Sequence, residues 1–278
     1  MSDFAGRIAV VTGAGSGLGA ALARTFAGVG MGVALLDIDE PAAASTAASI
    51  AADTGVATTS FRVDVGDAAS VVAGAEHVRA TLGGCDVLCA NVGVQQFGAV
   101  DRLTEQDWSW VMNVNVLGTV RTVSAFLPML RERSGWRRIV LTASSSVLAP
   151  SVRMAAYQTS KFAVMGYGET LREELKAEGI GVTIMFPGGM MTSHLDSSVR
   201  ARPAELGAST LDPADIDAML AHLPLGEGDL ATPQQAIRNL LADLDANEPY
   251  LLTHGSYRPT YERRRAAMDA ALKRMENS

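Results

Sequence analysis

The chain has 278 residues, 48% hydrophobic and 19% charged, so it can bury a substantial core in one large α/β domain or two small ones. Its formal net charge is −7 and no dense basic run occurs outside residues 263–265, so we expect no nucleic-acid partner. No stretch reaches the roughly 18 apolar residues of a membrane span, and the first residues lack the basic region of a signal peptide.

Short aliphatic or β-branched segments alternate along the chain with segments of helical length. We predict strands at 7–12, 32–37, 58–64, 86–91, 138–143, 181–186 and 249–253. We predict helices at 18–30, 41–53, 67–82, 104–132, 157–179 and 233–246. This alternation predicts an α/β chain with a single-domain, Rossmann-like, doubly wound fold. Its seven-stranded parallel sheet, in the order 3-2-1-4-5-6-7, is flanked by helices on both faces.

One region departs from the alternation. From about 192 to 232 the chain is rich in Pro, Ala, Asp and Gly, and a loop of that length is usually functional or disordered. It follows the sixth strand, on the side where such sheets bind ligands, so we interpret it as a substrate lid. A disordered insertion is the alternative. A solvated helical tail is expected at about 258–276 within the single domain 1–278.

The first strand leads into the glycine-rich turn TGAGSGLG at 12–19. Gly13, Gly17 and Gly19 fall between a strand and a helix, where the backbone turns tightly and the helix N-terminus favours an anion. The strand–turn–helix context favours dinucleotide binding over a turn that only connects.

The second predicted strand ends at Asp37. A carboxylate there can accept hydrogen bonds from the hydroxyls of an adenosine ribose and repels a 2′-phosphate. Asp39 and Glu40 add negative charge, and no Lys or Arg occurs from residue 13 to 23 to neutralise a phosphate. The pattern favours NAD over NADP, and an exposed acidic turn is the alternative.

The segment YQTSK places Tyr157 four residues before Lys161. On a helix these positions share a face, so the ammonium can lie near the phenol. A free tyrosine has a pKa near 10, and nearby cations stabilise the phenolate. Lowering that pKa by ~2–3 units corresponds to about 3–4 kcal/mol. Tyr157 would then exchange a proton with a substrate near neutral pH.

Taken with these motifs, the chain resembles the short-chain dehydrogenase/reductase family over roughly residues 4 to 255. The resemblance rests on TGxxxGxG at 12–19, NVG at 91–93, NVNVLG at 113–118, Ser144, YQTSK at 157–161 and PGGMMT at 187–192. Val92 stands where the family usually has alanine. The resemblance implies a catalytic tetrad of Asn115, Ser144, Tyr157 and Lys161. In it, Ser144 polarises the substrate oxygen, Lys161 also holds the nicotinamide ribose, and Asn115 anchors a water for proton relay.

The resemblance also implies which residues bind the cofactor, expected to be NAD. They are Gly13, Ser16, Gly17, Leu18, Gly19, Asp37, Ile38, Asp64, Val65, Asn91, Val92, Gly93, Tyr157, Lys161, Pro187, Gly188, Met190 and Thr192. For the substrate, the candidates include methionines, which adapt to irregular apolar shapes. The full set of substrate candidates is Gln95, Ser146, Met154, Met191 and His194.

These features predict an NAD-dependent oxidoreductase that transfers hydride between a secondary alcohol or ketone and the nicotinamide. The expected substrate is bulky and largely apolar or aryl. An NADPH-dependent carbonyl reductase and a non-catalytic dinucleotide-binding sensor are the alternatives. Residues 193–207 also resemble the lid of bacterial Cα-dehydrogenases that act on lignin-type aryl ethers.

The sequence also supports expectations about the oligomeric state of the protein and its cellular compartment. The family usually forms a homotetramer or homodimer. Cys85 and Cys89 lie about 13 Å apart along a predicted strand, at roughly 3.3 Å per residue, which is beyond disulfide reach. We therefore expect reduced thiols and a cytoplasmic protein. The four histidines are scattered, so we expect no metal site.

Overall fold

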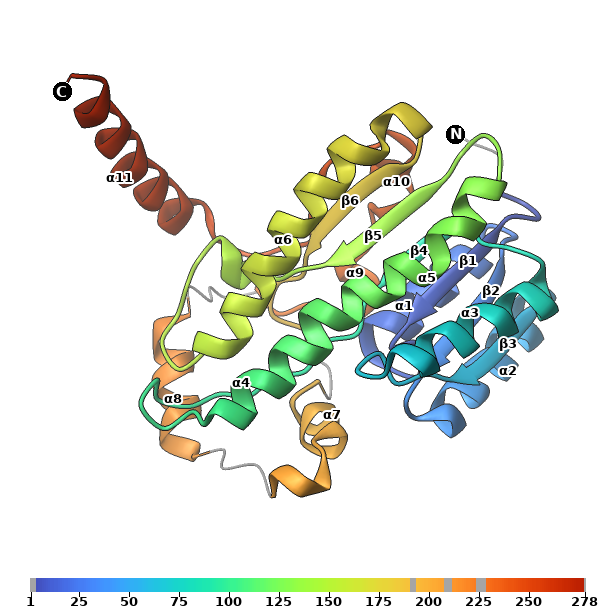
Figure 1. The fold of residues 1–278 in the computed structure, drawn as a ribbon, viewed down its shortest axis with the longest axis horizontal. Helices are drawn as coiled ribbons and strands as arrows, with labels where there is room; N and C mark the ends of the chain where they lie inside the picture. The colour runs from blue at the N-terminus through green and yellow to red at the C-terminus, as the bar shows by residue number, and fades with distance from the viewer. Residues whose placement is uncertain (1–3, 191–193, 208–211, 224–228, 278) are drawn as a thin grey trace.

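The computed structural model describes residues 4–190, 194–207, 212–223 and 229–277 (Figure 1). Its centre is one sheet of seven parallel strands in the order β3-β2-β1-β4-β5-β6-β7, which confirms the predicted fold and strand order. The strands are β1 (Ile8–Thr12), β2 (Gly32–Asp37), β3 (Thr58–Arg62), β4 (Val87–Ala90), β5 (Arg138–Thr142), β6 (Gly181–Phe186) and β7 (Tyr250–Leu252).

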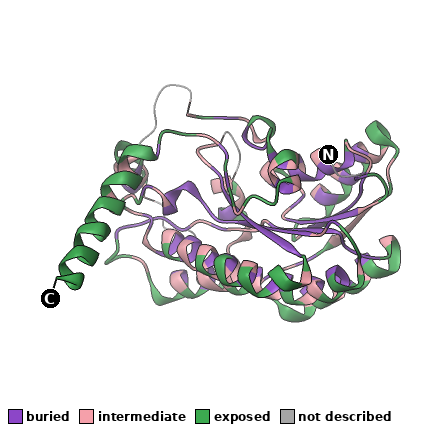
Figure 2. Cartoon of the chain, turned by 90° about the horizontal axis from the view of Figure 1, so that it is seen from above, coloured by how far each residue is buried: buried purple, intermediate pink, exposed green. Residues whose placement is uncertain are grey.

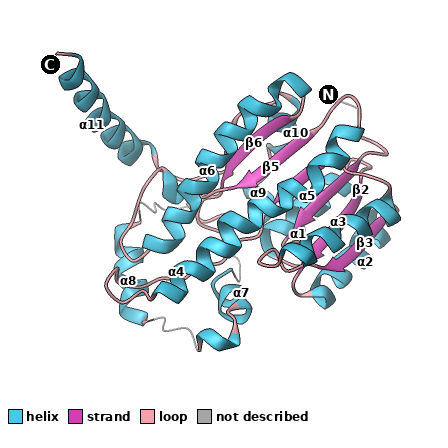
Figure 3. Ribbon diagram, in the orientation of Figure 1, coloured by secondary structure: helices cyan, strands magenta, loops and turns pink. Residues whose placement is uncertain are grey.

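Helices cover both faces of the sheet, so the central strands are buried on both sides (Figures 2 and 3). On one face α3 (Ala68–Leu82), α5 (Gly118–Glu132) and α6 (Ala155–Leu175) pack through residues such as Phe126. On the other face, α1 (Gly17–Ala27), α2 (Glu40–Thr54) and α10 (Leu240–Asp245) pack through Phe26, Ile50 and Leu240. The two apolar layers hold the carboxyl ends of the strands in register.

The predicted helix at 104–132 consists of three parts. It begins as α4 (Glu105–Met112), whose N-terminus carries a reciprocal Thr104–Asp107 capping box. A π-helical turn follows at Asn113–Leu117, and the chain then continues as α5. Single π turns inside longer helices occur frequently at functional sites. This one contains Asn115, a predicted member of the tetrad.

The region predicted as a lid contains two helices among its described residues, α7 (His194–Ala201) and α8 (Pro213–His222), with a 3₁₀ turn at Ala204–Leu206. Its two ends meet, because Met190 forms a parallel β-bridge with Ala231, just before the short α9 (Pro233–Ala236).

Ion pairs with buried carboxylates join this region to the rest of the chain. Arg202 lies 2.7 Å from Asp107 of α4, and both side chains are almost fully buried. Asp215 of α8, also buried, lies 2.6 Å from Arg102 and 2.9 Å from Arg153. Both contacts link the region to loops and helices at the carboxyl edge of the sheet.

The last helix, α11 (Arg258–Glu276), projects away from the rest of the molecule (Figures 1 and 2). None of its 19 residues, all of which the structure describes, is buried. Across the described part of the chain, no helix combines the length and the apolar character that a membrane span requires.

Candidate active site

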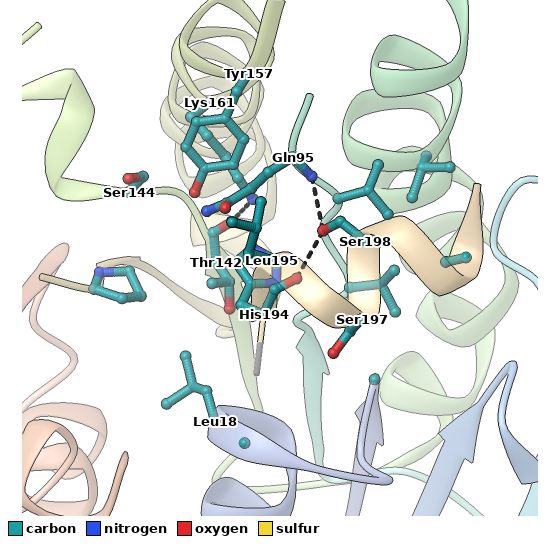
Figure 4. Close-up of a pocket in the computed structure, with 18 of the residues that line it drawn as sticks. Leu18, Gln95, Thr142, Ser144, Tyr157, Lys161, His194, Leu195, Ser197 and Ser198 are labelled. Carbon is teal, nitrogen blue, oxygen red and sulfur yellow. Dashed lines mark hydrogen bonds between the residues drawn. The ribbon is translucent and has the colours of Figure 1, made fainter. Parts of the chain in front are cut away.

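A cleft of about 980 Å³ lies at the carboxyl edge of the sheet. The segments that follow β1, β2, β4, β5 and β6 line it, together with α7 and α8. Figure 4 shows Ser144, Tyr157, Lys161 and Gln95 gathered near one another, with Leu18 of α1 further along the cleft. Doubly wound sheets bind their ligands at this edge.

The glycine-rich turn brings the N-terminus of α1 against the end of β1. Gly13 and Gly17 adopt φ angles of +67° and +52°, which favour glycine. A Cβ atom on Gly19 would overlap the carbonyl oxygen of Gly13. The first turn of α1 carries no acidic side chain, and Ser16 makes no side-chain capping bond to it. The result is a close, uncapped helix N-terminus that suits a phosphate group.

Asp37 stands at the end of β2, where it lines the cleft beside Ile38. Its carboxylate accepts hydrogen bonds from the backbone N–H groups of Gly15 (2.8 Å) and Asp39 (3.0 Å). Partial burial raises the pKa of Asp37, while these two N–H groups lower it in part. The carboxylate is therefore fixed against the glycine-rich turn, at the position expected for a ribose contact.

Asn91 holds together the strand ends that form the floor of the cleft. Its amide donates to the carbonyl oxygen of Thr12 (3.1 Å), and its Oδ1 accepts from the hydroxyl of Thr142 (3.2 Å). It therefore ties β4 to β1 and β5. On the neighbouring loop, the Asp64 carboxylate accepts from the backbone N–H of Gly66 (2.8 Å).

Tyr157 and Lys161 lie on consecutive turns of α6, as predicted. The Nζ of Lys161 is 5.6 Å from the ring centre of Tyr157 and donates to the carbonyl oxygen of Thr142 (2.9 Å). Both residues are buried. Burial lowers the pKa of Lys161 to about 8.

The pKa of Tyr157 differs from the expectation. Burial raises it, and hydrogen bonds with Ser144 and Gln95 lower it only in part. The expectation of a lowered pKa counted two cations in a partly desolvated site, the Lys161 ammonium and the positive nicotinamide of NAD⁺. In the folded chain, desolvation of the phenolate is the larger effect.

Ser144 and Asn115 occupy different positions relative to the cleft. Ser144 lines it, and its Oγ accepts from the backbone N–H of Ser146 (3.1 Å). The Asn115 side chain is fully buried behind it, bonded to both backbone groups of Val94 (2.8 and 3.0 Å) and to Ser160 (2.9 Å). Asn115 therefore joins the segment after β4 to α6, and its side chain is not among the described groups that line the cleft.

The remaining predicted cofactor residues line the cleft, from Gly13 to Met190 along the chain. Gly188 is held by a bond from its N–H to Thr253 (3.0 Å). Of the substrate candidates, Gln95, Ser146, Met154 and His194 line the cleft. Met191 and Thr192 lie outside the described residues.

Apart from Met154, sequence reasoning missed the apolar group around Tyr157. Phe97, Met154 and Met219 are buried against its ring, with Leu195, Ile216 and Leu223 packed around them. The ring centres of Phe97 and Tyr157 are 6.3 Å apart. The lid helices supply Leu195, Ile216 and Met219, Leu223 directly follows α8, and no local pattern placed those helices in advance. Phe97, two residues beyond the predicted Gln95, was the available signal besides Met154.

A short chain of hydrogen bonds fixes α7 beside the Tyr157–Lys161 pair. The backbone N–H of Gln95 donates to the hydroxyl of Ser198 (3.0 Å), which donates to the carbonyl oxygen of His194 (2.8 Å). Burial, with a smaller effect of the Lys161 charge, lowers the pKa of His194 to about 4. The imidazole is therefore neutral at physiological pH.

The sheet and this site define an oxidoreductase of the doubly wound, nucleotide-binding class. Within that class, the chain belongs to the short-chain dehydrogenase family, since the family model described as "short chain dehydrogenase" matches residues 7–203.

Known relatives agree with this assignment. The chain is 34% identical to D-threitol dehydrogenase of Mycolicibacterium smegmatis over 221 residues, which cover 80% of each chain. It is 38% identical over 190 residues to "Probable oxidoreductase EphD" of Mycobacterium tuberculosis, covering 68% of this chain. That match spans about a third (32%) of the longer EphD protein.

A solved structure resembles the whole chain. It is a short-chain dehydrogenase/reductase of Burkholderia phymatum in complex with NAD, 30% identical, with a TM-score of 0.88. The match covers 98% of this chain and 97% of that one.

Proposed function

We propose that this chain is an NAD-dependent dehydrogenase that transfers hydride between a secondary alcohol or ketone and the nicotinamide. The single observation that carries the proposal is one cleft that joins the Tyr157–Lys161 pair and Ser144 to the glycine-rich turn and Asp37. NAD, when bound, supplies the hydride acceptor of the oxidation or, as NADH, the donor of the reduction.

The residues of the cleft fit such a cofactor. The close turn at Gly13 and Gly19 leaves room for a pyrophosphate at the N-terminus of α1. Asp37 would accept from the adenosine ribose, and its charge disfavours a 2′-phosphate. The NAD complex of the Burkholderia phymatum relative supports the choice of NAD over NADP. Asp64 and Val65 would lie at the adenine, and the segment from Pro187 at the carboxamide.

Tyr157 is the proposed acid/base. In oxidation it would take the hydroxyl proton of the alcohol, and in reduction it would return a proton to the carbonyl oxygen. Ser144 would hydrogen-bond the same oxygen and polarise it. Lys161, whose pKa lies near 8, is largely an ammonium at pH 7, so it would favour the phenolate and hold the nicotinamide ribose. Asn115 was expected to anchor a relay water, but its buried side chain already bonds Val94 and Ser160, so it would hold the segment after β4 against α6 instead.

The substrate end of the cleft favours a bulky, largely apolar or aryl molecule. Phe97, Met154 and Met219 provide an apolar surface next to the Tyr157 ring. Gln95, which bonds Tyr157 in this structure, would exchange that bond for one to the substrate. Region 192–232 would act as the lid, because its described helices α7 and α8 line this end. Ser146 and His194 would be further substrate contacts.

The residues of the cleft disfavour two alternative functions. An NADPH-dependent carbonyl reductase is disfavoured by Asp37. A non-catalytic sensor is disfavoured by the complete set of Ser144, Tyr157 and Lys161.

We also propose a homotetramer or homodimer. Buried free thiols at Cys85 and Cys89 support a reducing, cytoplasmic compartment.

The test follows NADH absorbance near pH 9 with NAD⁺ and a panel of aliphatic, benzylic, steroidal and β-aryl ether alcohols, for the natural chain and Tyr157→Phe. We expect turnover with apolar or aryl alcohols and a loss of about 10²-fold or more in Tyr157→Phe, with NAD⁺ affinity unchanged. Full activity in Tyr157→Phe would exclude Tyr157 as the acid/base. Binding of NAD⁺ without any turnover would favour the sensor.

A further inference from the structure

A residue with a strained backbone stands two positions before α6, the helix that carries Tyr157. Arg153 adopts a φ of +65°, in the left-handed region that residues with a side chain rarely occupy. Such conformations persist only where surrounding contacts hold them, and they cluster at active sites and ligand clamps. Met154, the next residue, belongs to the apolar group around the Tyr157 ring. The conformation of Arg153 therefore helps to fix one side of the substrate end of the cleft.

Two contacts hold Arg153 in this conformation. Its carbonyl oxygen accepts a hydrogen bond from the backbone N–H of Gly98 (3.0 Å), which joins the loop before α6 to the loop after β4. Its Nε lies 2.9 Å from the carboxylate of Asp215, on the lid helix α8. Gly98 directly follows Phe97, a second member of the apolar group. The loop after β4 and the lid are thus both fastened to the strained residue.

Asp215 also binds a second arginine. Arg102, from the loop after β4, donates to both oxygens of the Asp215 carboxylate (2.6 and 2.7 Å). The Asp215 side chain is only 4% exposed, whereas those of Arg102 and Arg153 are 54% and 37% exposed. Because a buried carboxylate that loses its partners is strongly disfavoured, the position of α8 depends on these two arginines. One carboxylate therefore joins three segments that are far apart in the sequence.

Each of these three segments supplies one side chain to the substrate end of the cleft. Met219 lies four residues after Asp215, on the same side of α8, and is buried beside the Tyr157 ring. The other two side chains are Phe97, from the loop after β4, and Met154, from the start of α6. We call Phe97, Met154 and Met219 the apolar wall. Its shape depends on how the three segments are held together.

We propose that Asp215 is a positioning residue that determines which substrates fit. Its pairs with Arg102 and Arg153 hold the apolar wall in the shape that accepts the bulky side of a secondary alcohol. None of these three described residues lines the cleft itself, so the effect of Asp215 falls on substrate binding and not on the cofactor or on proton transfer. The inference rests on the proposed function, because it concerns the substrate end of the same cleft. A carboxylate that only stabilised the lid would affect all alcohols alike.

The first test compares turnover of 1-phenylethanol and 2-butanol, which carry a phenyl and an ethyl group beside the reacting carbon. Asp215→Asn keeps the shape of the side chain and removes its charge. We expect kcat/KM for 1-phenylethanol to fall about 10-fold or more, through KM, because even one methylene in an apolar pocket contributes roughly 10–200-fold. The values for 2-butanol and the Kd for NAD⁺ should stay close to those of the natural chain. Asp217→Asn, the same replacement at an exposed position of α8, is the matched control and should change none of these values.

A second variant separates the shape of the wall from the stability of the fold. Arg153→Gly removes one ion pair, but it also supplies the residue that a φ of +65° favours, so its two effects on stability oppose each other. Thermal unfolding measures their sum. We expect Arg153→Gly to lower the preference for 1-phenylethanol over 2-butanol as Asp215→Asn does. Arg153→Lys, which keeps the positive charge, should recover part of that preference.

Binding without turnover provides a third measurement. Tyr157→Phe protein loaded with NAD⁺ is titrated with each alcohol and followed by NMR, with and without Asp215→Asn. A natural chain that oxidises no alcohol would contradict the proposed function. In that case an affinity for 1-phenylethanol that falls with Asp215→Asn, while the affinity for 2-butanol does not, would still support the role of Asp215.

Three results would overturn the inference. They are a natural chain that neither binds nor turns over 1-phenylethanol in preference to 2-butanol, a preference that stays unchanged in Asp215→Asn, and an equal loss of preference in Asp217→Asn.

Discussion

Replacing Lys161 by methionine is expected to stabilise the cofactor-free protein while it removes activity. Folding buries the ammonium, which lowers the pKa from 10.5 to about 8. At roughly 1.4 kcal/mol per unit, holding the charged form costs the folded state about 3 kcal/mol. Methionine fills a similar volume without a charge, but it gives up the bond to the Thr142 carbonyl, worth about 1 kcal/mol. The expected net gain at pH 7 is about 2 kcal/mol.

The pH dependence identifies the cause of this gain. Below pH 8 the lysine is protonated in both the folded and the unfolded chain, so the full cost is present. Between pH 8 and 10.5 the folded chain gives up the proton while the unfolded chain keeps it. The stability of the natural chain therefore rises by about 1.4 kcal/mol per pH unit over this range, and the advantage of Lys161→Met disappears near about pH 9.5.

Urea unfolding of cofactor-free protein at pH 7 and pH 10 measures both effects. Lys176→Met is the matched control, because Lys176 is exposed and the same replacement there should change the free energy of unfolding by less than about 0.5 kcal/mol. NAD-linked turnover of Lys161→Met should fall by about 10²-fold or more. A Lys161→Met protein that is less stable than the natural chain at pH 7, or equally stable, would refute the reasoning.

Two further substitutions test the cofactor site and the lid. Asp37→Ser should weaken NAD binding about 10- to 100-fold and raise the relative affinity for NADP, because hydrogen bonds to a charged group contribute about 1.5–3 kcal/mol. Fluorescence titration with both cofactors measures this, and Glu40→Gln, an exposed neighbouring acid, should leave the ratio unchanged. Arg202→Met leaves Asp107 buried without its ion-pair partner, at a cost of up to about 3–5 kcal/mol. Hydrogen exchange in α7 should therefore accelerate in Arg202→Met and not in Arg200→Met, and unchanged exchange in both would argue against this ion pair holding the lid.

Features that depend on neighbouring residues were predicted from the sequence. The seven strands were found because parallel strands buried on both faces appear as short aliphatic runs. The glycine-rich turn and the Tyr157–Lys161 pair depend on spacings of a few residues, and the fold preserves those spacings. Asp37 was predicted for a similar reason, because it is the last residue of the aliphatic run that forms β2.

Features that depend on distant contacts were not predicted. The π turn at Asn113–Leu117 interrupts a sequence that otherwise favours one continuous helix, and its Asn115 bonds partners 21 and 45 residues away. The pairing of Arg202 with Asp107 joins residues 95 positions apart, and no local pattern indicates it. The direction of the Tyr157 pKa depends on how completely neighbouring elements exclude water from the phenol, which is a property of the packed cleft.

The bridge between Met190 and Ala231 brings the two ends of the segment between them together, while the pairs of Arg202 with Asp107 and of Asp215 with Arg102 and Arg153 tie the segment to the body. A different insert could join β6 and α9 at the same two points, but it would have to supply an ion-pair partner for the buried Asp107. The entropic cost of joining the ends changes slowly with length, about 0.6 kcal/mol for each doubling. Exchange of such a segment between relatives should therefore alter the lining of the cleft that α7 and α8 provide, while Tyr157 and Lys161 of α6 stay in place. New substrate ranges could then arise by recombination at Met190 and Ala231, which are neighbours in the fold but not in the sequence.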